Sequence, residues 1–341
     1  MERLLKSRYK IGEKISENPF SVSYKGSFLV NNKPVIIKIY KRGTLSSSLI
    51  KTMKQKVKDF SLINYHGIAK LIDGDYGWQG FYYVREYIEG QTLADLLATG
   101  STIGVEKSLA IVEEICKALS FAHSKGIIHG ALKPSNVIIN SQGVLKLADF
   151  VVEGEIMEAL PQKALTMMND GKYTSPEEIS GQAAGVSADI FALGLILYEM
   201  STSKSLPLEK GLATALRKLK KVALVDQGEL ATLPKYLQDI INKALQVDPA
   251  MRFCSADEFC ESLKKKNLIN KEISRDEFAQ IFESTVTHYG EEDLSQGKES
   301  LEDLGRIKLR WGRESHRNWI LALLLGAAVI AGLLYAFMIG I

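Results

Sequence analysis

Cysteine is scarce in this chain of 341 residues, which contains only Cys116, Cys254 and Cys260. Their spacing matches neither a metal-binding nor a redox motif. Three isolated thiols in a chain of this length are typical of a reducing compartment rather than of a disulfide-stabilised fold. A surplus of one charge is also lacking, because 43 basic and 40 acidic residues leave a net charge of +3. This near balance argues against nucleic acid as a partner.

The chain also lacks internal repeats, low-complexity tracts and an N-terminal signal sequence, since residues 1–10 are polar overall. Its hydrophobic content of 46% and charged content of 24% are those of a globular protein. The length suits one two-lobed domain, or two ordinary domains, together with an appendage.

A long uncharged run stands out over residues 319–341. At ~1.5 Å per residue a helix of this length spans ~34 Å, enough to cross a hydrocarbon core of ~30 Å. The run follows Lys308, Arg310, Arg313 and Arg317, a flank that the positive-inside rule places in the cytoplasm. We therefore expect a single-pass transmembrane helix that holds a cytoplasmic domain at a membrane. A buried soluble helix is the alternative.

Residues 268–318 are polar and carry mixed charge, so we interpret them as a charged juxtamembrane spacer. Within the apolar run, Ala328, Gly332 and Ala336 recur every four residues and would share one helix face. Such a stripe lets two helices approach closely, which makes a homodimer one interpretation. The other is that small residues are common in membrane helices without any special role.

The hydrophobic pattern changes its period near Gly90. Before this point short alternating runs predict strands, interrupted by one lysine-rich helix over about 48–63. The expected strands are Tyr9–Ile15, Ser21–Val30, Lys33–Tyr40, Ile68–Tyr76 and Phe81–Tyr87. Beyond it we expect helices over Leu109–Ala122 and Ala188–Met200 and short strands at Val137–Ile139 and Leu145–Leu147. This predicts an α+β fold with a small β-rich lobe (about 1–88), a helical lobe (about 89–267) and a cleft between them.

Seven short motifs occur in a fixed order along the chain. They are Pro34–Lys38, Glu86–Gly90, Gly126–His129, Asp149–Val151, Ser175–Glu177, Asp189–Gly194 and Asp248–Arg252. In order and spacing they resemble the landmarks of the Ser/Thr protein kinase superfamily. The resemblance covers about Tyr9 to Leu263 and implies a bilobal protein-kinase-like domain over residues 1–267. It also fits a bacterial source.

The same resemblance implies that the chain is a degenerate kinase. His129–Asn136 matches the catalytic loop, but Ala131 stands where kinases keep the Asp that accepts the substrate proton. The glycine-rich loop is lost too, because its three glycine positions hold Ser16, Asn18 and Ser21. Pro19 removes a backbone donor from this loop, and Glu17 brings a negative charge towards the expected phosphates. No intact catalytic group remains.

The expected nucleotide site is altered as well. Ile36 replaces a small alanine against the base, and Arg85 holds the position just before the hinge. Either Arg85 is buried and pairs with Asp149, or it points outward through a loosened pocket. The other expected lining residues are Glu86, Ile88 and Ile138.

The retained nucleotide-site groups are Lys38, Asn136 and Asp149, which the resemblance assigns as the phosphate lysine and two magnesium ligands. ATP and Mg²⁺ therefore remain conceivable ligands. In active kinases a glutamate pairs with the strand lysine, and that position here is Lys56. Asp59, one turn further on, could substitute as the partner of Lys38.

The structural devices of the family are better preserved. His129, Phe150, Phe60 and Leu71 match the apolar stack that links the lobes. Asp189 begins the motif of the central helix of the large lobe. The pair expected to form a buried ion bridge is Glu177 and Arg252.

Phosphorylation in the activation segment is not expected to switch this chain. Thr166, Tyr173 and Thr174 carry suitable hydroxyls, but Gly130 replaces the arginine that usually receives the phosphate. We interpret the lysine clusters at 218–221 and 264–266 as solvated faces.

Three functions remain open on the sequence. The leading hypothesis is a membrane-anchored pseudokinase that binds protein partners as a scaffold or allosteric regulator, because losing one general base costs roughly 10²–10⁴ in rate. The second is a divergent ATP-dependent Ser/Thr kinase with weak activity, since phosphoryl transfer depends strongly on positioning and charge. The third is a switch that binds a nucleotide without transferring phosphate.

Overall fold

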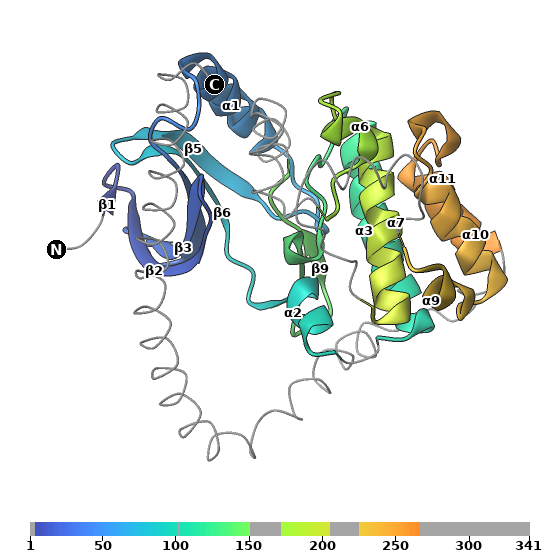
Figure 1. Ribbon diagram of the computed structural model, residues 1–341. Coiled ribbons are helices and arrows are strands. Elements are labelled where there is room, and N and C mark those ends of the chain that lie inside the picture. The colour runs from blue at the N-terminus through green and yellow to red at the C-terminus, as the bar shows by residue number, and fades with distance from the viewer. Residues whose placement is uncertain (1–3, 101–102, 151–171, 205–224, 266–341) are drawn as a thin grey trace, which may run out of the picture. The chain divides into compact units, whose positions relative to one another are not determined.

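The computed structural model describes residues 4–100, 103–150, 172–204 and 225–265, all of which belong to one compact unit. Strands occupy the first part of the chain and helices dominate the remainder (Figure 1), which agrees with the expected two-lobed α+β fold. Several predictions concern residues outside these ranges: Val151, Thr166, the cluster at 218–221, the spacer at 268–318 and the run at 319–341 with its small-residue stripe. Within the described ranges, no helix has the length and apolar character needed to cross a membrane.

The small lobe is one antiparallel sheet with a single helix, α1 (Ser47–Phe60). The strand order is β1-β2-β3-β4-β6-β5. The strands are β1 (Leu4–Leu5), β2 (Tyr9–Glu17), β3 (Ser21–Phe28), β4 (Pro34–Lys41), β5 (Leu71–Gly77) and β6 (Gly80–Glu86).

The strand β4 is central to the sheet and is buried over most of its length. Since side chains alternate between the faces of a strand, Val35, Ile37 and Ile39 share one face and pack in the small-lobe core. The opposite face carries Lys38 and Tyr40, and the register sets Lys38 beside Tyr83 of β6. This alternation places Lys38 on the side of the sheet that faces the large lobe.

The helix α1 lies over β5. Ser46 caps its start by accepting a hydrogen bond from the Leu49 N–H, and the helix buries Met53, Val57 and Phe60. Gly74 allows the close approach, because a Cβ atom there would lie 2.8 Å from Val57 Cγ1. The position of α1 matters because it brings Phe60 towards the large lobe.

The large lobe begins with a small three-stranded sheet and continues as packed helices. The sheet contains β7 (Gly90–Thr92), β8 (Val137–Asn140) and β9 (Leu145–Leu147). The helices are α2 (Leu93–Ala98), α3 (Val105–Ser124), α6 (Pro176–Ile179), α7 (Val186–Thr202), α9 (Gln227–Ala231), α10 (Lys235–Ala244) and α11 (Ala256–Lys265), with short 3₁₀ turns η1 (Pro134–Asn136) and η2 (Pro249–Met251).

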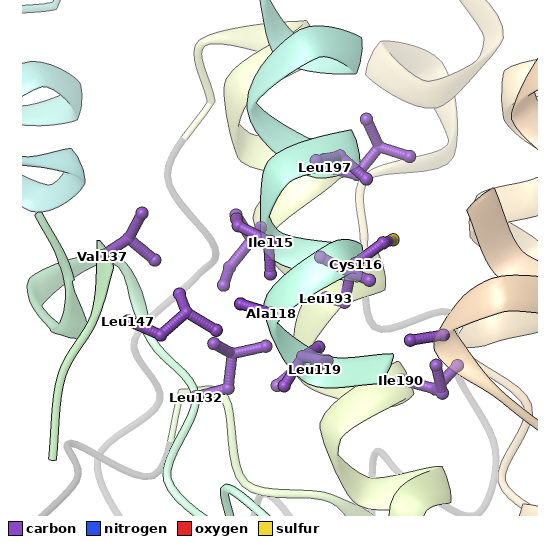
Figure 2. Packing of buried hydrophobic residues seen from close by; sticks show 14 of the residues in the cluster. Ile115, Cys116, Ala118, Leu119, Leu132, Val137, Leu147, Ile190, Leu193 and Leu197 are labelled. Atoms are coloured by element: carbon purple, nitrogen blue, oxygen red, sulfur yellow. The ribbon is translucent and has the colours of Figure 1, made fainter. Parts of the chain in front are cut away.

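The core of the large lobe forms around α3 and α7 (Figure 2). Ile115 and Leu119 of α3 lie among Leu132, Val137 and Leu147 on one side and the α7 side chains on the other. The helix α7 is buried on almost every face, which explains its nearly uninterrupted apolar sequence. This rigid core supports the loop from His129 to Asn136.

The predicted elements agree with the structure to within a few residues at most ends. The strand expected from Ile68 begins instead at Leu71, because Ile68 forms only an isolated bridge to Leu147. The lysine-rich helix ends at Phe60, three residues before the predicted end at Ile63. After it the chain turns, since Ser61 donates its N–H to the Asp59 and Val57 carbonyl oxygens.

Candidate nucleotide site

The site expected to bind a nucleotide centres on Asp149, which follows β9. Its carboxylate Oδ2 lies 3.8 Å from Lys38 Nζ, and both side chains are only 11% exposed. Asp149 adopts a left-handed backbone conformation with φ of 63°, which is costly for a residue other than glycine. The strand β4 and the chain after β9 therefore bring together a lysine and an aspartate that are far apart in sequence.

Arg85 occupies the centre of this site. Its Nε donates to Asp149 Oδ1 at 2.8 Å, and its Nη1 donates to the Glu86 carbonyl oxygen at 3.3 Å. The side chain is 12% exposed. The structure thus forms the buried pair, and the outward orientation of Arg85 is wrong. The guanidinium thus also binds the Glu86 carbonyl oxygen of the hinge. The base of a nucleotide was expected to bind at this hinge.

Charge determines the protonation of this cluster. Burial alone would raise the pKa of the Asp149 carboxyl, but the Arg85 and Lys38 cations hold that pKa well below its usual range. Burial, together with the nearby cations Lys133 and Arg85, lowers the pKa of Lys38 to about 8 against the opposing attraction of Asp149. Asp149 is therefore a charged carboxylate shared between two cations.

Two tyrosines that the sequence reasoning missed complete the cluster. Tyr40 and Tyr83 are fully buried beside Asp149, and burial together with the Asp149 charge raises both hydroxyl pKa values. The alternation of β4 could have identified Tyr40, because it shares a face with Lys38 two residues earlier. Tyr83 could be placed only from the register of β4 with β6, which sets it opposite Lys38.

The loop expected to close over phosphates is instead closed on itself. The side-chain oxygen of Asn18 accepts the backbone N–H groups of Phe20 at 2.9 Å and Ser21 at 2.7 Å, and the Ser21 hydroxyl at 3.2 Å. The backbone N–H of Asn18 in turn donates to the Ser21 carbonyl at 2.9 Å. Two of the donors that would face a phosphate are thus already used, and Ser21 is buried while Ser16 is exposed.

Glu17 does not direct an unbalanced charge towards the site. Its carboxylate is exposed and pairs with Lys14 at 3.0 Å and with Lys41 at 2.9 Å. These pairs neutralise the charge that the sequence led us to expect near the phosphates. The poor fit of the loop to a nucleotide therefore comes from Asn18 and Pro19.

The apolar lining of the expected base site is present. Ile36 and Ile138 are each 7% exposed, and Ile138 packs with Ala69 and Ala148 against the partly buried Ile88. The side chain of Glu86 turns away to Lys146, whose Nζ lies 2.6 Å from its Oε1.

The catalytic loop offers no general base. Ala131 is 4% exposed, and its carbonyl oxygen accepts a hydrogen bond from Asn136 Nδ2 at 3.0 Å. Among the residues that the structure describes, no group of three or more His, Cys, Asp and Glu side chains could hold a metal. Since Asp149 is paired with two cations, the residues present do not fit a magnesium ion.

The small-lobe helix supplies no carboxylate to Lys38. Lys56 is half-buried on α1, and Asp59 is exposed, where it accepts a hydrogen bond from Gln55 Nε2 at 2.8 Å. The expectation that Asp59 substitutes as the lysine's partner is therefore wrong. Asp149 is the carboxylate that pairs with Lys38.

The apolar stack between the lobes is assembled. The rings of Phe60 and Phe150 are stacked with centroids 5.7 Å apart, and the His129 ring lies 4.3 Å from Phe150. Leu71 is buried in the same core. Burial lowers the pKa of His129, and its Nδ1 accepts the Ala131 N–H at 3.3 Å, so this imidazole is a neutral structural group.

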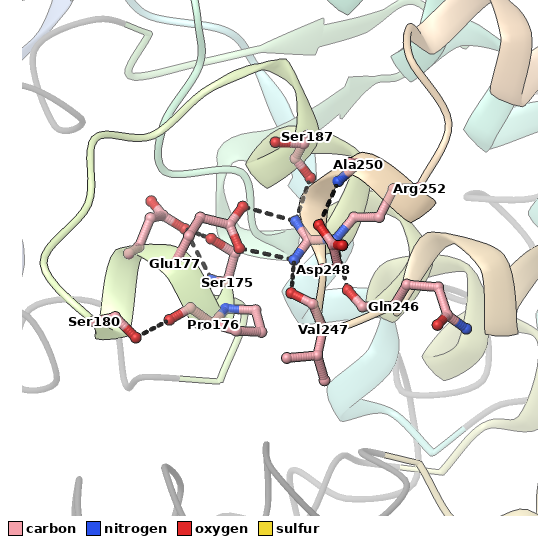
Figure 3. Close-up of polar contacts among 11 residues, drawn as sticks. Ser175, Pro176, Glu177, Ser180, Ser187, Gln246, Val247, Asp248, Ala250 and Arg252 are labelled. Atoms are coloured by element: carbon pink, nitrogen blue, oxygen red, sulfur yellow. Dashed lines mark hydrogen bonds and ion pairs between the residues drawn. The ribbon is translucent and has the colours of Figure 1, made fainter.

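Two carboxylates fix the large lobe beneath the site. Asp189 of α7 accepts the backbone N–H groups of His129 and Gly130, each at 2.9 Å, and contacts His123 Nε2 at 2.8 Å. Glu177 receives two bonds of 2.7 Å from Arg252 (Figure 3). The remaining Arg252 donors reach three backbone carbonyls, those of Gln246, Val247 and Ser187.

The hydroxyls considered for phosphorylation are engaged where the structure describes them. Thr174 is buried, and the Tyr173 hydroxyl donates to the buried Glu199 carboxylate, which Lys172 also contacts. Neither hydroxyl is presented to a kinase in this conformation, in line with the loss of the phosphate-receiving arginine at Gly130.

This combination of a sheet-and-helix lobe pair, an assembled stack and a Lys38–Asp149 pair is the architecture of a protein kinase. The model of the protein kinase domain matches residues 9–267, and the chain belongs to this family.

Its relatives include bacterial enzymes. The chain is 26% identical over 263 residues to the serine/threonine-protein kinase PrkC of Bacillus subtilis, covering 76% of this chain and 40% of the relative. It is 25% identical over 263 residues to the serine/threonine-protein kinase PknB of Mycolicibacterium smegmatis, covering 74% of this chain and 42% of the relative. The chain thus spans about two fifths of the length of these relatives. Its domain is serine/threonine kinase-like.

The fold is also shared with a solved structure. The crystal structure of Rad53 residues 1–466 in complex with AMP-PNP matches 73% of this chain and 64% of that chain, with a TM-score of 0.59 and 21% sequence identity. At this identity the match concerns the fold alone.

Proposed function

We propose that this protein is a pseudokinase whose nucleotide site is filled by its own side chains, and that it acts as a scaffold or allosteric regulator for protein partners. The observation that carries the proposal is the position of Arg85, which binds both Asp149 and the Glu86 carbonyl. One side chain therefore takes the acceptor of the expected metal site and an acceptor of the expected base site.

Two further features support this proposal. Asn18 satisfies the loop donors that would hold phosphates, and Ala131 has no group that can accept a proton. Loss of one general base alone costs roughly 10²–10⁴ in rate. The rings of Phe60, Phe150 and His129 form the apolar stack between the lobes. In this proposal the domain keeps the lobe-to-lobe packing of a kinase but does not catalyse phosphoryl transfer.

The proposal includes a membrane location. The uncharged run at 319–341 and its basic flank support a single-pass anchor that keeps the kinase-like domain in the cytoplasm. Confinement to a surface raises the local concentration of partners held at the same membrane, which suits a scaffold. A homodimer through Ala328, Gly332 and Ala336 is the corresponding proposal for its assembly.

A divergent Ser/Thr kinase is the second candidate. The observation that favours it is the retained Lys38–Asp149 pair, with Lys133 close enough to influence the pKa of both. Weak transfer would then need Arg85 to leave Asp149 when Mg-ATP enters.

Mg-ATP binding separates these candidates. With the full chain in mild detergent, calorimetry and thermal-shift titration to millimolar Mg-ATP should show no binding to the wild type. Arg85→Met should gain weak binding, because it frees Asp149 and the Glu86 carbonyl. Arg8→Met is the matched control, since it removes an exposed Arg–Asp pair of 3.0 Å far from this site, and it should gain nothing.

Two outcomes would contradict the proposal. Tight binding to the wild type with turnover that Lys38→Met or Asp149→Ala abolishes would establish a divergent kinase. Binding to the wild type without phosphotransfer would establish a nucleotide-binding switch.

A further inference from the structure

Two of the three thiols meet inside the large lobe. Cys116 of α3 and Cys260 of α11 are 1% and 6% exposed and belong to the same core. The helices α3 and α11 contact each other directly. Figure 2 shows the sulfur of Cys116 on the side of α3 away from Val137 and Leu147. Cys254 is exposed, so the chain contains its own reference thiol.

An ion pair fixes the register of the two helices. Glu113 Oε1 of α3 lies 3.0 Å from Lys264 Nζ of α11. Cys116 lies one helical turn beyond Glu113, and Cys260 lies one turn before Lys264. A turn advances a helix by ~5.4 Å, so antiparallel helices joined at Glu113 and Lys264 bring Cys116 and Cys260 opposite each other. The geometry holds the two thiols face to face.

The two thiols are chemically unequal. A hydrogen bond from Cys116 lowers the pKa of the Cys260 thiol, and the Lys264 cation lowers it further against the opposing effect of burial. Burial raises the pKa of the Cys116 thiol, and the interaction with Cys260 raises it more. Because the thiolate is the nucleophilic form, Cys260 is the member of this pair that attacks an oxidant.

We propose that Cys116 and Cys260 form a redox pair that hydrogen peroxide converts into an intrachain disulfide joining α3 to α11. The Cys260 thiolate attacks one peroxide oxygen, the O–O bond breaks, and the released hydroxide takes a proton to leave as water. Cys116 then attacks the Cys260 sulfenic sulfur, and its thiol proton leaves with the departing hydroxide as a second water. Two thiols are oxidised by two electrons, and one peroxide is reduced to two waters.

The consequence concerns the C-terminal end of the domain. The helix α11 ends at Lys265 and leads into residues 266–341. In the thiol form side-chain packing, the contact between the two thiols and the Glu113–Lys264 ion pair hold α11 on α3. The disulfide would add a covalent link that closes a long loop, which restricts the unfolded chain and raises thermal stability. Oxidation thus joins α11, the last helix that the structure describes, covalently to α3.

The test oxidises the folded full chain in mild detergent with hydrogen peroxide and then alkylates the remaining thiols. Peptide mass spectrometry should find a Cys116–Cys260 cross-link that dithiothreitol reverses, together with a rise in Tm of about 4 °C or more. Cys254→Ser should form the same cross-link. Cys116→Ser should lose it and instead accumulate a Cys260 sulfenic acid that a dimedone probe traps.

The wild type and Cys254→Ser decide the question even if the buried variants fold poorly. The proposal would be overturned if peroxide sulfenylates Cys254 while Cys116 and Cys260 stay reduced. A cross-link that forms only in denaturant, or a disulfide that involves Cys254, would also overturn it, because either result would mean that the folded interface does not pair these thiols.

Discussion

Arg85 shows how one buried side chain can occupy the acceptors of an expected ligand site. A buried arginine is costly unless its donors are satisfied, and here Asp149 and the Glu86 carbonyl satisfy it. The same two contacts remove the acceptors that a metal and a base would use. The contacts that stabilise the buried Arg85 cation are therefore the same contacts that remove the ligand site.

A double-mutant cycle measures this contact. Arg85→Met and Asp149→Asn should each destabilise the protein, and their coupling energy in urea unfolding should be about 1–3 kcal/mol because the pair is buried. The exposed pair Arg8–Asp73 is the reference, with an expected coupling of about 0–1 kcal/mol. Equal couplings at the two sites would mean that Arg85 is solvated and does not fill the site.

Arg252 provides a second test at the scale of one residue. Its side chain is fully buried, and all its donors have acceptors, two of them on Glu177. Arg252→Lys keeps the charge but loses the bidentate geometry and leaves Glu177 underpaired, so we expect a loss of about 3–5 kcal/mol in the free energy of unfolding. Lys235→Ala, which removes an exposed pair, should change it by less than about 0.5 kcal/mol. A mild effect of Arg252→Lys would mean that Glu177 finds other donors.

At the scale of elements, the positions of the helices depend on how closely their backbones can approach one another. A Cβ atom on Gly194 of α7 would lie 2.7 Å from the Ala244 Cβ of α10. Contacts of this kind let α7 be covered on nearly every side, which in turn holds Asp189 beneath the catalytic-loop backbone. Helix packing in the large lobe thus positions Asp189, which in turn holds the backbone of the loop at His129 and Gly130.

The substitution Gly194→Ala has two opposing effects on the free energy of unfolding, one from helix propensity and one from packing. Alanine favours a helix by about 1 kcal/mol over glycine, but the clash with Ala244 should cost more, about 1–3 kcal/mol. We therefore expect a net loss of stability in urea unfolding. Gly194→Ala combined with Ala244→Gly should recover part of it. A stabilised single variant would show that α10 can move away without cost.

The short helix α6 contains a titrating cap. Glu178 accepts the Ser175 N–H at 2.8 Å and the Ser175 hydroxyl at 2.7 Å, while burial raises the pKa of Glu178 to about 7. An acid whose pKa is raised on folding binds more protons in the folded state. Its contribution to stability is therefore complete below the unfolded pKa and is lost as the pH rises towards about 7.

Glu178→Gln tests this pH dependence. The wild type should lose on the order of 1–2 kcal/mol of unfolding free energy through this group between about pH 5 and pH 8, and the variant should lose that slope. The amide oxygen still accepts both Ser175 bonds, so the cap itself is kept. Glu106→Gln, in the exposed first turn of α3, should leave the slope unchanged. An identical slope in wild type and Glu178→Gln would place the pKa of Glu178 near its usual value.

For the whole molecule, the two lobes are joined by a charged contact and an apolar stack. Arg85 of β6 reaches Asp149 after β9, and Phe60 of α1 reaches Phe150. The lobes of the described chain are therefore held together by its own side chains.

Metal addition and removal should accordingly leave the molecule unchanged. Because Arg85 and Lys38 already pair with Asp149, we expect Mg²⁺ not to bind there, so Tm with millimolar MgCl₂ and Tm with excess EDTA should agree within about 1 °C. Arg85→Met, which frees Asp149, is the variant in which a Mg²⁺ effect is expected. A clear rise of the wild-type Tm with Mg²⁺ would mean that Asp149 exchanges Arg85 for the metal.

Much of the site followed from residues that act locally. The side chain of Ala131 cannot accept a proton in any fold, and the motif order places it in the catalytic loop. The self-closing of the loop at Asn18 was also within reach, because an Asn side chain readily accepts backbone N–H groups two and three residues ahead. The sequence indicated the lost glycines, Pro19 and the charge of Glu17 as the causes of the poor loop, and Lys14 and Lys41 neutralise that charge.

The sequence by itself determined the family, the order of the elements and the missing proton acceptor, because each depends on residue type and on spacing along the chain. Tertiary structure alone decided the partners of Arg85, Lys38 and Cys116. Those partners lie far away in sequence, and whether two distant groups meet depends on strand register and helix packing. For Arg85 the sequence was compatible with both a buried and an outward orientation of the side chain. Only the folded chain, by bringing β6 beside the end of β9, made the buried pair with Asp149 the one that forms.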